Sequence, residues 1–301
     1  MSHVAGIVLL SVSLILVASA QAPDPLPRAT PESQGMSAAR LDEATTLLRQ
    51  LVDEGTVAGV VAGVARHGRL VYLEAAGAQD LSSGTPMTAR SIFRIYSMAK
   101  PVTAVAAMIL HDEGRFRLDD PVSKYLPEFA GVRVVPEPGA TSRPPTRPVT
   151  VEDLLLHTSG LSHRTSELYR TLEVRSRTIA LPQFIANITH APLMEDPGTR
   201  FRYSEATTVV GRLIEVWSGR PLEDFLDARV FRPLGMTDTA FWADATRRAR
   251  LVQAYAPQDG GLAPEPRPRQ LVGRAQEGLE RHVAPGLRVA GVEHGAHAAA
   301  P

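Results

Sequence analysis

The chain of 301 residues contains no cysteine. That absence excludes disulfide bonds, thiolate zinc sites, cysteine nucleophiles and a lipid-modified N-terminal cysteine. An excess of charge is also lacking, because 32 lysines and arginines balance 32 aspartates and glutamates. Broad nucleic-acid binding needs surplus cations to neutralise phosphates, so we expect no nucleic-acid partner. The sequence has no phosphate-binding glycine loop and no His-Glu-x-x-His motif, so we expect neither a cofactor nor a metal.

Lysine is scarce, because only Lys100 and Lys124 are lysines and every other basic residue counted is an arginine. A lysine can lose its proton when it is removed from water, whereas an arginine effectively cannot. A lysine retained in a chain that otherwise uses arginine is therefore a candidate for proton transfer.

The first 20 residues resemble an export signal. Residues 4–20 are almost entirely apolar or small, and Ala18-Ser19-Ala20 fits a small-x-small cleavage site. The run is short for a membrane span, which needs about 20 apolar residues. We expect a cleaved signal, a periplasmic or extracellular location, and no stable membrane span after cleavage. An uncleaved anchor and an ordinary buried helix are the alternatives, because no lysine or arginine precedes the apolar core.

Periodicity and turn residues predict the elements that follow a proline-rich linker at residues 21–34. Val- and Leu-rich segments flank His67-Gly68 and predict a β-hairpin. Thr150 is expected to cap a short helix, and a proline-rich loop is expected at residues 131–148. Apolar residues at helical spacing predict further helices at residues 37–54, 97–111, 205–217 and 221–231.

The last 40 residues, 262–301, differ from the rest in composition. Alanine, glycine, proline and arginine supply more than half of them, and the β-branched alternation typical of strands is missing. We expect disorder or weak helix here, and we interpret the segment as an out-of-frame or truncated end.

Ser97 and Lys100 form a Ser-x-x-Lys motif at the start of a strongly apolar helix. This spacing places both side chains on one helix face, within hydrogen-bond reach. The positive partial charge of the helix N-terminus favours a developing oxyanion and disfavours an ammonium, and desolvation lowers a lysine pKa in the same direction. The motif therefore predicts a serine nucleophile beside an amine base.

The surrounding sequence resembles the serine β-lactamase and penicillin-binding-protein superfamily, most closely its class C β-lactamase and esterase branch. The nucleophile segment is residues 92–103 (IFRIYSMAKPVT). Further matches follow in the family's order at residues 118–122 (LDDPV), 125–127 (YLP), 149–161 (VTVEDLLLHTSGL), 197–204 (PGTRFRYS) and 231–239 (FRPLGMTDT). The resemblance covers residues 35–261, which we take as one domain.

The resemblance implies an α/β (α+β) fold, an antiparallel sheet flanked by helices with an inserted all-α domain. It implies that Ser97 forms an acyl-enzyme with a small-molecule ester, amide or β-lactam-like substrate. Lys100 and Tyr203 would share the proton transfer, and Tyr203 is the favoured base, although the sequence leaves the choice between them open. His157, in the turn signature, is interpreted as structural.

Two departures from the family pattern bear on activity. Many relatives have Tyr-x-Asn in the second motif, but position 205 is Glu205, whose carboxylate cannot donate to a substrate amide. The third motif, a Lys/His-x-Gly or Trp-Gly-Gly strand, has no convincing copy, since His282-Val283-Ala284 and His294-Gly295-Ala296 do not fit. Together they favour an esterase-like serine hydrolase lacking its C-terminal strands. The alternative is a non-catalytic or inactive relative that only binds a ligand.

Overall fold

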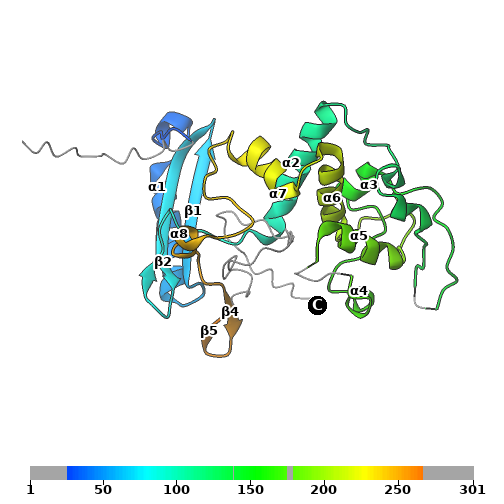
Figure 1. Ribbon diagram of the computed structural model, residues 1–301. Coiled ribbons are helices and arrows are strands. Elements are labelled where there is room, and N and C mark those ends of the chain that lie inside the picture. Colours follow the sequence, from blue (N-terminus) through cyan, green and yellow to red (C-terminus); the bar gives the residue numbers. More distant parts are fainter. Residues whose placement is uncertain (1–25, 138, 175–178, 267–301) are drawn as a thin grey trace, which may run out of the picture.

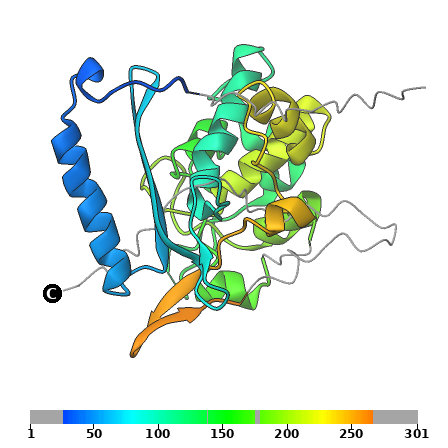
Figure 2. The same cartoon turned by 90° about the vertical axis from the view of Figure 1, so that its left-hand side faces the viewer.

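The computed structural model describes residues 26–137, 139–174 and 179–266. An antiparallel sheet lies between helix α1 on one side and the remaining helices on the other (Figures 1 and 2). This is the expected sheet flanked by helices, with a helical region inserted in the chain. The predicted signal at residues 1–20 and both candidate third motifs lie outside the described residues.

The N-terminal part forms α1 and the sheet. Strands β1 (Gly59–Arg66), β2 (Arg69–Asp80) and β3 (Thr85–Pro86) pair in the order β1-β2-β3. His67 and Gly68 join β1 to β2 with φ of 50° and 69°, the left-handed conformation that a two-residue hairpin turn needs. Ser37 caps α1 (Ala38–Asp53) by accepting a hydrogen bond from the backbone N–H of Arg40. The predictions of this hairpin and helix are confirmed.

The helical part is organised around α6, which contacts α2, α3, α5 and α7. Its apolar face is fully buried, including Val209, Leu213 and Ile214. The helices are α2 (Ala99–Asp112), α3 (Val151–Leu155), α4 (Glu167–Thr171), α5 (Leu181–His190), α6 (Ala206–Ser218), α7 (Leu222–Leu226) and α8 (Ala245–Arg248). Short 3₁₀ turns are η1 (Glu32–Gln34), η2 (Tyr96–Met98), η3 (Val122–Lys124) and η4 (Pro127–Gly131). Within the described residues, no helix has the length and apolar character to cross a membrane.

The helix predicted at residues 221–231 is not regular. It consists of α7 followed by the π-helical turn η5 (Asp227–Phe231). Leu226, Val230 and Phe231 all remain buried across this change of winding. Apolar spacing marked the buried face, but it could not distinguish an α turn from a π turn.

A second hairpin corrects the expectation for the start of the C-terminal segment. Strand β4 (Tyr255–Gln258) pairs with β5 (Gly261–Pro264), so residues 262–264 belong to a strand and not to a disordered or helical tail. The turn uses Gly260 at φ of 88°, and strand pairing supplies the order that the composition did not suggest. The remaining tail, from residue 267, lies outside the described residues.

Asp153 ties α3 to the turn that follows it. The residue is 3% exposed, and its carboxylate accepts hydrogen bonds of 2.6 and 2.8 Å from Arg147 and one of 3.0 Å from Thr158 Oγ1. Asp153 and Thr150 also form a capping box at the start of α3. The carboxylate thus orders the predicted cap and the turn carrying His157.

We expect Asp153→Asn to lower the free energy of unfolding by about 2–3 kcal/mol, because it removes charge-assisted hydrogen bonds from a buried site. Burial raises the pKa of Asp153, but hydrogen bonds from Arg147 and Thr150 lower it more, so the folded pKa lies below the unfolded one. The carboxylate's contribution is therefore complete above about pH 4 and is lost as the pH falls through the folded pKa.

Urea unfolding of both proteins across the acid range measures the difference. The control is Asp119→Asn, whose ion pair with Arg117 is exposed to solvent, so its free energy of unfolding should stay close to that of the wild type. Equal stability of Asp153→Asn and the wild type at pH 7 would contradict the anchoring role.

Candidate active site

Ser97 lies in the tight turn η2, which leads directly into α2. It therefore precedes the α-helix, where the sequence had predicted that it lies within the helix. Tyr96 has φ of 42°, a left-handed conformation that costs a non-glycine residue about 1–3 kcal/mol. Ser97 is exposed in this turn. A strained backbone thus presents the hydroxyl at the N-terminal end of a helix.

Tyr203 reaches Ser97 from a distant part of the chain, the irregular segment just before α6. Its hydroxyl donates a hydrogen bond of 2.6 Å to Ser97 Oγ, and Lys100 Nζ lies 3.4 Å from the same oxygen. Lys100 Nζ also lies 4.5 Å from the centroid of the Tyr203 ring. The three residues singled out by the motifs come together in space, and their catalytic roles stay a prediction.

The electrostatic environment makes the Tyr203 phenol more acidic. Burial raises the pKa of Tyr203, but hydrogen bonding to Lys100 and Ser97 and the positive charges of Lys100 and Arg164 lower it more. The pKa therefore lies below its ordinary value near 10. A nearby positive charge favours ionisation of this phenol. Two are present, Lys100 in α2 and Arg164 in the loop that follows α3.

Two imidazole rings lie against the Tyr203 ring. The His157 ring centroid is 5.1 Å away at an interplanar angle of 27°, and the His163 centroid is 5.6 Å away at 40°. Both histidines belong to the loop that follows α3. His163 and Arg164 were missed in the sequence, where their only signal is that they lie within three residues of the end of the turn signature.

Glu205 is 4% exposed and already has partners in the protein. Its carboxylate accepts a hydrogen bond of 3.1 Å from Thr208 Oγ1 and lies 3.9 Å from Arg164. An ionised carboxylate in these contacts has no proton to offer a substrate amide. The structure thus buries Glu205, the residue that departs from the family's second motif, two positions after Tyr203.

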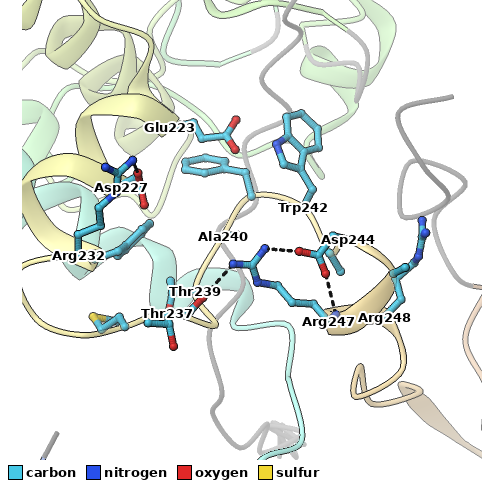
Figure 3. Close-up of a pocket in the computed structure, with 15 residues that line it drawn as sticks. Glu223, Asp227, Arg232, Thr237, Thr239, Ala240, Trp242, Asp244, Arg247 and Arg248 are labelled. Atoms are coloured by element: carbon cyan, nitrogen blue, oxygen red, sulfur yellow. Dashed lines mark hydrogen bonds and ion pairs between the residues drawn. The ribbon is translucent and has the colours of Figure 1, made fainter. Parts of the chain in front are cut away.

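A cavity of about 510 Å³ lies elsewhere, between the α7–η5 segment and the loop leading into α8 (Figure 3). Glu223 and Arg232 lie on one side of it, and Trp242 and Arg248 lie on the other (Figure 3). Arg247 crosses between Asp244 and the backbone carbonyl of Thr237. None of Ser97, Lys100 and Tyr203 lines this cavity. In the described part of the chain, no group of three or more acidic or histidine side chains is placed to hold a metal ion.

Comparisons with known proteins agree on one family. The family model described as Beta-lactamase matches residues 44–297, a range that continues past Gly261. Esterase EstB of Burkholderia gladioli is 37% identical over 212 residues, covering 68% of this chain and 51% of EstB. Protein Rv1367c of Mycobacterium tuberculosis is 36% identical over 227 residues, covering 73% of this chain and 57% of that protein.

A solved structure has the same arrangement of the chain. EstCE1, a hydrolase with promiscuous acyltransferase activity, aligns with a TM-score of 0.69 and 31% identity, covering 82% of this chain and 65% of EstCE1. The chain therefore spans 51% to 65% of the length of these three relatives.

Proposed function

This chain belongs to the beta-lactamase family, and from that membership we propose that it is a serine hydrolase that forms an acyl-enzyme on Ser97. The observation that carries the proposal is the convergence on Ser97 Oγ of the Tyr203 hydroxyl at 2.6 Å and Lys100 Nζ at 3.4 Å. A serine hydroxyl within hydrogen-bond reach of a phenol and an amine is activated when one of the two loses its own proton and takes that of the serine.

In the proposed reaction, Ser97 Oγ attacks the carbonyl carbon of an ester or amide. Its proton passes to the Tyr203 phenolate or to the Lys100 amine, and the carbonyl electrons move onto the oxygen. The N-terminal end of α2 stabilises that oxyanion through its positive partial charge. Collapse of the intermediate breaks the bond to the leaving group, which takes the proton. Water then cleaves the acyl-enzyme with the same residue as base.

The side chains around Ser97 favour an apolar substrate. Tyr96, Met98 and Phe201 are 42%, 62% and 65% exposed, respectively. Tyr96 and Met98 flank the nucleophile, and the Phe201 ring lies 6.0 Å from His157, whose ring stacks on Tyr203. Exposed apolar side chains gathered at a reactive group are typical of a ligand-binding surface. We therefore propose small esters with an apolar acyl or alcohol part.

We expect esters to be hydrolysed in preference to β-lactams, with kcat/KM for p-nitrophenyl butyrate exceeding that for nitrocefin by about 100-fold or more. The reason is Glu205, which cannot donate a hydrogen bond to the amide of a β-lactam side chain. Glu205→Asn is expected to narrow the gap. Equal kcat/KM for the two substrates in the wild type would contradict the preference.

Covalent labelling tests the proposed function. The folded protein is treated with a fluorophosphonate, and the adduct is located by mass spectrometry of its peptides. One adduct on Ser97 is expected, together with hydrolysis of p-nitrophenyl butyrate. A folded sample that gives neither an adduct nor hydrolysis favours the non-catalytic reading.

A further inference from the structure

The segment that carries Tyr203 is irregular, and the phenol is 40% exposed. Neither a helix nor a strand ladder therefore holds the ring against Ser97. Contacts from the loop after α3 supply that restraint. Within this loop, His157 contacts the Tyr203 ring and both of its neighbours in the chain.

His157 contacts the chain on both sides of Tyr203. The backbone N–H of Arg202 donates a hydrogen bond of 2.8 Å to the His157 carbonyl. The backbone N–H of Ser204 donates one of 3.3 Å to His157 Nδ1, and Ser204 Oγ lies 3.2 Å from the same nitrogen. Because the imidazole also stacks on the phenol, His157 contacts both the backbone on either side of Tyr203 and the face of its ring.

We propose that neutral His157, with its proton on Nε2, is the positioning residue that sets the Tyr203 hydroxyl against Ser97. The proposal rests on the function proposed above. The tautomer follows from the Ser204 N–H, since a nitrogen that accepts a hydrogen bond carries no proton. Protonation of Nδ1 would place two donors against each other and release Ser204.

The backbone of His157 is itself held in a conformation that needs support. Its φ is 57°, in the left-handed region. The hydroxyl of the neighbouring Thr158 donates a hydrogen bond to the buried Asp153 carboxylate. The backbone N–H of Thr158 donates a second one, of 2.8 Å, to the Asp153 carbonyl. Asp153, in the capping box of α3, thus stabilises the turn at residues 157–158, and this turn sets the orientation of the His157 imidazole.

The surroundings keep the imidazole neutral. Burial lowers the pKa of His157, and the positive charge of Lys100 lowers it further. Glu205, just before α6, acts in the opposite direction, and His163 in the same loop lowers the pKa again. The phenol of Tyr203, which stacks on the imidazole, is a further titratable group that faces His157. The pKa of His157 lies below its ordinary value near 6.5, so the hydrogen bond to Ser204 persists into mildly acidic solution.

Two substitutions separate the hydrogen bond from the ring contact. His157→Phe keeps an aromatic ring but removes the acceptor, whereas His157→Asn places an amide oxygen where Nδ1 was and tolerates positive φ. The matched control is His67→Asn, since His67 is an exposed histidine with φ of 50° in the β1–β2 turn.

For p-nitrophenyl butyrate, His157→Phe is expected to lower kcat by about 10- to 100-fold with KM changed less than about twofold, because the phenol is misplaced. His157→Asn should recover most of kcat, and His67→Asn should match the wild type. The phenol of Tyr203, titrated by ultraviolet difference absorbance against Tyr203→Phe, should ionise at higher pH in His157→Phe.

The outcomes are distinguishable. If the wild type neither labels nor hydrolyses esters, the proposed function fails, and the phenol titration still tests the positioning. If the wild type is active and folded His157→Phe keeps its kcat and pH profile, the positioning inference is overturned. If His157→Phe and His157→Asn both lower kcat, raise KM and lower thermal stability to the same extent, the inference is also overturned, and His157 has a structural role. If His157→Phe does not fold, the titration of Tyr203 in His157→Asn decides. Ionisation of the phenol at the same pH as in the wild type supports the inference, and ionisation near pH 10, as in an ordinary tyrosine, overturns it.

Discussion

Ser97→Ala is expected to lower kcat for ester hydrolysis by on the order of 10⁴- to 10⁶-fold. The substitution removes the oxygen that forms the acyl bond, and neither Lys100 nor Tyr203 can take its place, because both are aimed at that oxygen. The same variant should show no fluorophosphonate adduct.

Ser123→Ala provides a matched control, since Ser123, like Ser97, is the middle residue of a three-residue 3₁₀ turn, here η3. Its kcat and labelling should equal those of the wild type. Stopped assays with p-nitrophenyl butyrate and intact-protein mass spectrometry measure both quantities. Hydrolysis by Ser97→Ala within tenfold of the wild type would assign the nucleophile elsewhere.

Tyr203→Phe is expected to lower kcat by about 10²- to 10⁴-fold with little change in KM, the usual loss when a general base or acid is removed. The phenyl ring can still stack on His157 and lie beneath Lys100, so the substitution removes the hydroxyl and little else. Tyr125→Phe is the control, because the Tyr125 hydroxyl also donates a bond of 2.6 Å, but to the carboxylate of Asp120.

The pH dependence of kcat/KM tests whether Tyr203 acts as the base. A base acts when deprotonated, and the pKa of Tyr203 lies below its ordinary value. We therefore expect kcat/KM of the wild type to rise with pH through an apparent pKa below about 10. Tyr203→Phe should lack this rise. A Tyr203→Phe enzyme with the wild-type rate and pH profile would assign the proton transfer to Lys100.

Local parts of the fold could be predicted from short stretches of sequence. Ser37 and Thr150 cap the helices that they were expected to cap, and His67-Gly68 makes the expected hairpin turn. These features depend on residues within a few positions of one another, so a short window contains the whole cause. Two local features were missed for other reasons. The strand at residues 262–264 lacks the β-branched residues typical of strands, and apolar spacing does not distinguish the π-helical winding of η5 from an α-helix.

The sequence alone determined that a serine and a lysine three residues apart would lie close together where an apolar helix begins, because that spacing is local, although it did not show that Ser97 lies in a 3₁₀ turn before α2. It also predicted, through family resemblance, that Tyr203 belongs with them. Only the tertiary structure decided how the phenol is held: a backbone segment bracketed by His157, and Arg164 shared with the buried carboxylate of Glu205. Such contacts join residues far apart in the chain, and no spacing or periodicity in the sequence records them.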